Sequence, residues 1–295
     1  MSSVPPPPQF RPGAPVPVPV PAPAPPGRAG WPPWLSIAAF TAGFGITIVL
    51  GFVVIVGVSV FGVSQKAPGI NIGLTLVQNV ALVGAAYGFA ALQGRPAAAD
   101  FGLRPTRLWR SVGLLVAVWI GFFVLAAVWA AALGLNEQQN LPDELGADGP
   151  LPNVLAVVVL IAVVAPLGEE LFFRGFFFGA LRNWHGPWLA AVLTGLVFGG
   201  IHAGSSPVGY LVPLAFFGIG LCLLYEWTGS LYPSIALHAL NNSLALGANL
   251  DWSWQIPVMM VVCTPSALAC AWLLARAIGD GRRPDAVSAP VPGPA

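Results

Sequence analysis

The chain has 295 residues, of which 56% are hydrophobic and only 8% are charged, with a net charge of +1. Soluble domains carry about one quarter charged residues, so a soluble globular protein is not expected. No block of basic residues occurs, which argues against a nucleic-acid partner. The three cysteines, Cys222, Cys263 and Cys270, lie in apolar stretches, and we interpret them as packing residues rather than disulfides or ligands.

Residues 1–30 are rich in proline, including the runs PPPP and PVPVPVPAPAPP. Proline lacks the amide donor that a helix needs, so this segment is predicted to be an extended, disordered tail. It lacks the pattern of a cleavable signal peptide, and the first apolar span is expected to act as the insertion signal. A second disordered tail is predicted for residues 279–295. The membrane domain is then 31–278, with its motif core at 152–249.

Apolar runs long enough to cross a bilayer as helices recur along the whole of this domain. The sequence therefore predicts an all-α fold, a polytopic transmembrane helical bundle of about eight spans. The predicted spans are 35–62, 70–93, 111–135, 152–180, 187–205, 208–227, 231–249 and 254–277.

Orientation in the cell membrane follows from the basic residues of the short connections, which gather on the cytoplasmic side. If the N-terminus is cytoplasmic, that side collects ten arginines and the other side only Lys66. Both termini are therefore predicted to be cytoplasmic, with residues 136–151 outside. Glu226, in the stretch YEWTGSLYP, is interpreted as a solvated charge at a cytoplasmic helix end. The cytoplasmic arginines are Arg11, Arg28, Arg95, Arg104, Arg107, Arg110, Arg182, Arg276, Arg282 and Arg283.

The stretch GEELFFRG, residues 168–175, places three charges inside an apolar span. A charge at membrane depth is costly, and by default it indicates a functional site. Glu170 and Arg174 are four residues apart and can form an ion pair on one helix face. Glu169 points about 100° further round, and this spacing leaves it without such a partner. It is the better candidate for a proton acceptor, although an inert polar network of the three charges is the alternative.

The stretch FGGIH, residues 198–202, ends in a histidine within the next span. Gly199 and Gly200 would allow a helix or a substrate backbone to approach His202 closely. A lone histidine at this depth is as often a simple hydrogen-bonding residue between helices as a functional one.

The stretch HALNN, residues 238–242, lies in the seventh span. His238 and Asn242 are one turn apart, so an imidazole and an amide donor face the same way. Such a donor can stabilise an oxyanion in a dry site. Asn241 is expected to bond to a neighbouring helix.

These three stretches resemble the motifs EExxxR, FxxxH and HxxxN of the CPBP family of intramembrane proteases, also called the Abi or CAAX protease family. The resemblance covers roughly residues 95–250, including FGLRPTR at 101–107, and the motifs occur in order on separate spans. It implies an all-helical intramembrane endopeptidase, of glutamate type or metallo type, whose site opens toward the cytoplasm.

The resemblance also implies roles for individual residues. Glu169 would be the general base that activates a water molecule, assisted by His202. Glu170 and Arg174 would support it. His238 and Asn242 would complete the pocket, with Asn242 as an oxyanion donor.

Members of this family are often described as metalloproteases, and two histidines and a carboxylate would suffice for zinc with one open position. Glu169, His202 and His238 would then be the ligands. The HExxH helix motif is absent, however, and the ligands would have to converge from three helices. We expect a water-activating site with no obligatory metal, and zinc stays an alternative.

The expected substrate is a membrane-associated protein or peptide, and the sequence leaves open whether it is prenylated. One competing interpretation is a non-catalytic membrane scaffold or bacteriocin-immunity protein. Another is a proton-coupled transporter, which would usually show paired repeats that this sequence lacks. The composition favours a bacterial source, and the sequence leaves the oligomeric state open.

Overall fold

The computed structural model describes residues 29–62, 64, 67–135, 145–147 and 149–280. This part of the chain contains no strand, so the predicted all-α class is confirmed. The predicted tails, 1–30 and 279–295, fall almost entirely outside the described residues. In chain order the elements are α1 (Trp34–Val60), α2 (Pro68–Ala91), the 3₁₀ turn η1 (Ala98–Phe101), α3 (Leu108–Leu133), α5 (Leu151–Val159), the π-helical η2 (Leu160–Val164), α6 (Ala165–Glu170), the π-helical η3 (Leu171–Phe178), α7 (Gly179–Gly200), the 3₁₀ turn η4 (Val208–Tyr210), α8 (Leu211–Thr228), α9 (Tyr232–Asn249) and α10 (Gln255–Ile278).

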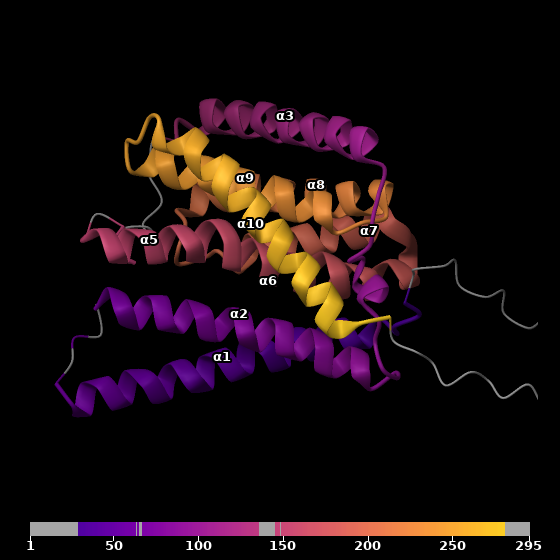
Figure 1. Cartoon of the computed structure of the whole chain (residues 1–295), viewed down its shortest axis with the longest axis horizontal. Coiled ribbons are helices and arrows are strands. Elements are labelled where there is room, and N and C mark those ends of the chain that lie inside the picture. The colour runs from indigo at the N-terminus through magenta and orange to yellow at the C-terminus, as the bar shows by residue number, and fades with distance from the viewer. Residues whose placement is uncertain (1–28, 63, 65–66, 136–144, 148, 281–295) are drawn as a thin grey trace, which may run out of the picture.

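The long helices form a bundle along the long axis of the molecule, with α1 and α2 at one side and α3 at the other (Figure 1). Helices α5 to α9 fill the middle, and α10 crosses them obliquely. Large apolar side chains on α1 and α3, such as Phe52, Val53, Ile120 and Val124, are exposed. A soluble protein rarely presents such continuous apolar faces, whereas a bilayer solvates them. The bundle is therefore that of a multi-pass membrane protein.

Six helical segments of the described chain are long and apolar enough to cross a bilayer, so the predicted count of about eight spans is not confirmed. One of the six, Leu151–Gly200, has 50 residues, more than twice what one crossing needs. Its backbone leaves the helical conformation at His185 and Gly186, where two helices meet at a kink. Helix α9 coincides with a predicted span but carries more polar residues than the other long helices.

The two ends of the bundle differ in charge. The arginine end, as we call it, consists of residues 29–33, 92–107, 182–187, 228–232 and 276–280. Hydrogen bonds join these segments: Ser230 Oγ donates to the Arg104 carbonyl over 2.7 Å, and the Ala98 amide donates to the Gly279 carbonyl over 3.0 Å. The opposite end consists of the described parts of 61–67, 134–150, 201–210 and 250–254.

Glu226 at the arginine end is held in an ion pair. Arg182 Nη1 lies 3.0 Å from Glu226 Oε2, and the two side chains are 6% and 12% exposed. The prediction of a solvated Glu226 is therefore wrong. The partner is 44 residues away in the sequence, so spacing within one helix could not reveal it.

The helical run from α5 to η3 passes through the centre of the bundle. All eight residues of η3 are buried, and Arg174 is the only charged residue among them. In the π-helical register of η2, residue 166 would donate to the Ile161 carbonyl, but Pro166 has no N–H. The Asn242 side chain of α9 donates to this carbonyl over 2.9 Å. The proline thus creates an acceptor that ties α9 to the central run.

Helices α7 and α8 pack closely along a row of glycines. A Cβ at Gly199 would lie 2.5 Å from the Leu211 carbonyl oxygen, and one at Gly195 would lie 2.6 Å from that of Ala215. The predicted close approach at Gly199 is therefore confirmed, and the approaching element is α8. A Cβ at Gly200 would meet nothing within 4 Å, so no described helix approaches there, and the approach of a substrate backbone stays a prediction.

Candidate active site

The motif residues converge in the middle of the bundle. Four of the six predicted site residues line one cavity of about 370 Å³: Glu169 from α6, His202 after α7, and His238 and Asn242 from α9. The other two, Glu170 and Arg174, lie behind the cavity wall and are completely buried. The structure thus brings the three motifs together, as the sequence predicted, but divides the residues between a cavity-facing group and a packed group.

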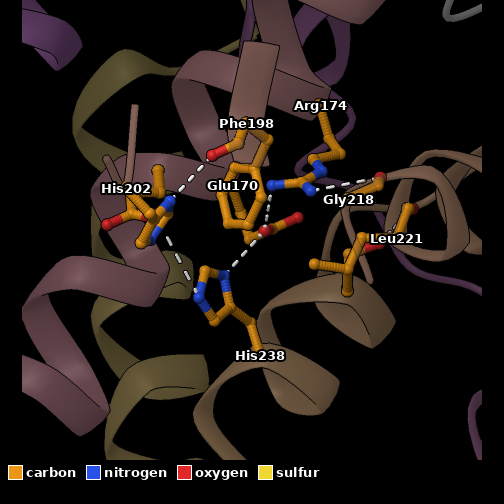
Figure 2. A network of polar contacts seen from close by, with 9 residues as sticks. Glu170, Arg174, Phe198, His202, Gly218, Leu221 and His238 are labelled. Atoms are coloured by element: carbon orange, nitrogen blue, oxygen red, sulfur yellow. Dashed lines mark hydrogen bonds and ion pairs between the residues drawn. The ribbon is translucent and has the colours of Figure 1, made fainter. Parts of the chain in front are cut away.

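The packed group is a hydrogen-bonded network of three side chains, Glu170, Arg174 and His238 (Figure 2). Glu170 Oε1 accepts hydrogen bonds from Arg174 Nη1 over 2.7 Å and from His238 Nδ1 over 2.8 Å. Arg174 Nη2 also donates to the Gly218 carbonyl over 3.2 Å. A buried carboxylate is tolerable when a cation and further hydrogen bonds compensate it, and both are present here.

The contact with Glu170 determines which ring nitrogen of His238 carries the proton. A carboxylate only accepts, so His238 Nδ1 carries the proton in the contact with Glu170. In the neutral imidazole the other nitrogen, Nε2, is then an acceptor. The sequence predicted the Glu170–Arg174 pair from their spacing of four residues. It could not predict the contact with His238, which lies 68 residues further along the chain.

Glu169 contrasts with its neighbour. Its Oε2 is buried and has no hydrogen-bond partner among the described residues. The nearest basic atom is His238 Nε2 at 3.9 Å, which is beyond hydrogen-bond distance. The side chain is 15% exposed, against 0% for Glu170, and this exposure is to the cavity. Glu169 is therefore the carboxylate of the pair that a bound water or substrate can reach.

His202 is oriented by its own helix. Its Nδ1 lies 2.7 Å from the Phe198 carbonyl oxygen, which can only accept, so Nδ1 carries the proton. The other nitrogen, Nε2, faces His238, and Figure 2 draws a polar contact between the two rings. Two imidazoles and one carboxylate thus converge on the cavity.

Phe198 packs against Arg174 and against both histidine rings, a role that the sequence did not predict. Its ring centroid lies 4.4 Å from Arg174 Cζ, 4.9 Å from the His202 ring and 5.8 Å from the His238 ring. A cation over an aromatic face is stabilised by the ring quadrupole. The signal was present in the sequence, because Phe198 is the first residue of FGGIH, four residues before His202.

Asn242 lines the cavity as predicted, but one hydrogen of its amide is already used in the bond to the Ile161 carbonyl. The second amide hydrogen is the only one left for an oxyanion. Asn241 Oδ1 accepts a hydrogen bond from Trp119 Nε1 of α3 over 3.3 Å, which confirms the expected bond to a neighbouring helix.

Helix α2 supplies a polar wall that the sequence did not assign to the site. Thr75, Gln78 and Asn79 all line the cavity. Asn79 is 5% exposed, and its Oδ1 has no partner within the described chain. This oxygen lies against the central helix, where a Cβ on Gly168 would be only 2.5 Å away. The missing side chain of Gly168 therefore makes room for an acceptor next to Glu169.

The three residues named as zinc ligands do not form a metal site in this arrangement. Within the described residues, no three His, Cys, Asp or Glu side chains are grouped closely enough to hold a metal ion. His238 uses its Nδ1 for Glu170, which leaves the lone pair of Nε2 directed toward the cavity.

Comparison with known proteins concerns this motif-bearing part of the chain. Residues 151–244 match the family model described as type II CAAX prenyl endopeptidase Rce1-like. The chain is 30% identical over 138 residues to an uncharacterized 24.3 kDa protein of Escherichia coli, a match that covers 46% of this chain and 61% of that protein. It is 28% identical over 129 residues to the UPF0177 protein YxdF of Lactococcus lactis, covering 42% and 70% respectively. The match thus spans less than two thirds of the E. coli protein, and no solved structure matches significantly.

Proposed function

Because residues 151–244 match the family model described as type II CAAX prenyl endopeptidase Rce1-like, we propose that the chain is an intramembrane endopeptidase acting on membrane-associated proteins or peptides. The observation that carries this proposal is the difference between the two adjacent glutamates. Glu170 is compensated by Arg174, whereas Glu169 presents a carboxylate without a hydrogen-bond partner to a cavity at membrane depth.

The first step is the activation of water. A water molecule about 2.8 Å from both Glu169 Oε2 and His238 Nε2 fits their separation of 3.9 Å. Glu169 takes one proton as the water oxygen attacks the carbonyl carbon of the scissile bond. The water donates its second hydrogen to His238 Nε2, which orients the attacking oxygen, and His202, whose ring faces that of His238, assists this placement. The product of this step is a tetrahedral intermediate with a negatively charged oxygen.

The second step is the collapse of this intermediate. The remaining amide hydrogen of Asn242 donates to the charged oxygen and stabilises it in a site with little water. The carbon–nitrogen bond then breaks, and Glu169 returns the proton to the leaving amine. The carboxylate is regenerated and the products are a carboxylic acid and an amine. Glu170 and Arg174 do not touch the substrate. Glu170 positions His238 through the hydrogen bond to its Nδ1, and Arg174 compensates the charge of Glu170.

The proposal includes the expectation that no metal is obligatory and that the substrate is a membrane-associated protein or peptide. A non-catalytic scaffold or immunity protein, and a proton-coupled transporter, are the outcomes that the test must separate from it. Neither relative carries a name that assigns an activity.

The test compares the termini of membrane proteins in strains that express the wild-type chain, Glu169→Gln or no copy. The amide keeps the size of the carboxylate but cannot accept the proton. New termini that appear with the wild-type chain and disappear with Glu169→Gln would support a peptidase. If the wild-type and Glu169→Gln strains have identical termini while both chains accumulate in the membrane, the peptidase proposal fails.

A further inference from the structure

The cavity is extended toward one end of the bundle only. Two connections between helices contribute to its wall, through Leu145 and through residues 203–206. Both belong to the opposite end. Thr75 of α2 and Leu214 of α8 also line the cavity, and they lie about 10 Å and 5 Å from the ends of their helices on that side, at 1.5 Å per residue. The described lining thus reaches the opposite end of the bundle.

Toward the arginine end the cavity has a closed floor. No residue of the arginine-end segments contributes to the lining. Immediately beyond Glu169 the central helix continues with Glu170 and Arg174, which are paired and completely buried. Around them, aromatic side chains of η3 and α8 with no exposed surface fill the space: Phe172, Phe173, Phe176, Phe178, Phe217 and Tyr225, each at 0% or 1%.

The charges indicate which end faces the cytoplasm. Of the seven described arginines, Arg174 is in the floor and the other six lie at or within one turn of the arginine end: Arg95, Arg104, Arg107, Arg110, Arg182 and Arg276. The described residues of the opposite end include no Lys or Arg, and in the sequence this end has only Lys66. Basic residues in short connections stay in the cytoplasm, so the arginine end is the cytoplasmic one.

From these two observations we propose that the site opens to the non-cytoplasmic face of the membrane. The identity of the substrate rests on the proposed function: it is then a segment of a membrane-anchored protein exposed on the non-cytoplasmic face, and not a cytoplasmic C-terminus. This differs from the cytoplasmic opening that the family resemblance implies.

The lining also indicates the chemistry of that segment. Near the mouth the wall contains uncharged polar residues, Ser205 and Ser206, beside apolar ones such as Ile201 and Leu214, and Gln78 lies deeper, next to Asn79. Glu169 is the only Asp, Glu, Lys or Arg in the described lining. An extended segment of small, uncharged residues can bond to these hydroxyl and amide groups without burying an unpaired charge.

Thiol labelling tests the direction of opening without any assay of activity. Cys222, Cys263 and Cys270 are first replaced by alanine, and a single cysteine is introduced by Ala203→Cys, an exposed residue at the mouth. The matched control is Gln93→Cys, an exposed residue at the arginine end. We expect a membrane-impermeant maleimide to label Ala203→Cys in spheroplasts and Gln93→Cys only in inside-out vesicles.

The opposite labelling pattern for either cysteine would overturn the proposal. So would a cysteine at position 203 that reacts from neither side of the membrane but reacts in detergent, because the cavity would then open only to lipid.

The comparison of termini tests the substrate. Glu169-dependent termini should map to segments on the non-cytoplasmic face. If they map to cytoplasmic segments, the direction of access is wrong while the peptidase stands. If no Glu169-dependent termini exist but labelling occurs as expected, the peptidase is wrong while the direction of opening stands.

Discussion

The two halves of the candidate site are made from neighbouring residues but are in opposite electrostatic situations. In the packed half, Glu170 accepts from both Arg174 and His238, and no part of its side chain is exposed. In the cavity half, Glu169 and Asn79 each have a buried oxygen without a hydrogen-bond partner among the described residues. A buried polar atom without a partner is costly. Glu170 Oε2 and Arg174 Nε also lack a partner within the described chain, but neither residue lines the cavity, whereas Glu169 and Asn79 both do. The packed half therefore contributes to the stability of the fold, and the cavity half contains the residues proposed to carry out the chemistry.

The largest effect should come from the cavity half. Glu169→Gln should lower turnover by about 10²- to 10⁴-fold, the usual contribution of a general base, while the melting temperature in detergent changes little. The substrate is a peptide spanning a cleavage site found by the comparison of termini. Asp251→Asn, which removes an exposed carboxylate at the opposite end, is the control for loss of charge alone. Turnover that survives in Glu169→Gln would assign the proton transfer to another group.

Substitutions in the packed half should lower the stability of the folded protein. Arg174→Ala leaves Glu170 buried without its cation, which costs about 3 to 5 kcal/mol. Folded protein and melting temperature should both fall, whereas Arg110→Ala, at an exposed position, should have neither effect. Adding Glu170→Gln to Arg174→Ala should restore part of the stability, because it removes the uncompensated charge. Equal melting of Arg174→Ala and the wild-type chain would show that the pair is dispensable.

A smaller effect should appear where the two halves meet, at Gly168. A Cβ there would lie 2.5 Å from Asn79 Oδ1, so Gly168→Ala should destabilise the chain by about 1 to 3 kcal/mol and displace Asn79. Gly200→Ala, whose Cβ would meet nothing within 4 Å, is the matched control. The double variant Gly168→Ala, Asn79→Ala should recover most of the loss. If it does not, the contact with Asn79 is not the cause.

The smallest expected effect is that of metal removal. Turnover of the purified protein should be unchanged by strong chelation, and elemental analysis should find zinc far below one atom per chain. A zinc enzyme would instead lose activity on chelation and regain it when zinc returns, because the metal lowers the pKa of its bound water. That result would replace the proposed mechanism and leave the peptidase assignment in place.

The sequence predicted well what depends on local periodicity. Helix α9, for example, was predicted at 231–249 and spans Tyr232–Asn249, and Pro233 lies in its first turn. The pair of Glu170 and Arg174 followed from a spacing of four residues, and their Nη1–Oε1 distance is 2.7 Å. Both results depend on residues within one helix.

The rest depends on contacts between distant segments, which spacing cannot reveal. Glu170 meets His238 across 68 residues, and Asn242 meets Ile161 across 81. Asn79 was not assigned to the site, because nothing in the sequence of α2 indicates that it faces Gly168. The role of Asn242 as an oxyanion donor stays a prediction, now limited to one amide hydrogen.

The aromatic floor has a consequence for the membrane itself. A cavity that admits water and carries Glu169, His202 and His238 resembles the entrance of a proton pathway, and titratable groups at this depth relay protons in pumps and transporters. The phenylalanines of η3 offer no group that can pass a proton on, and Arg174 is held by Glu170 and the Gly218 carbonyl. The same layer that closes the cavity on the arginine end thus separates the cavity from that side of the membrane. A cell can carry this cavity without dissipating its proton gradient.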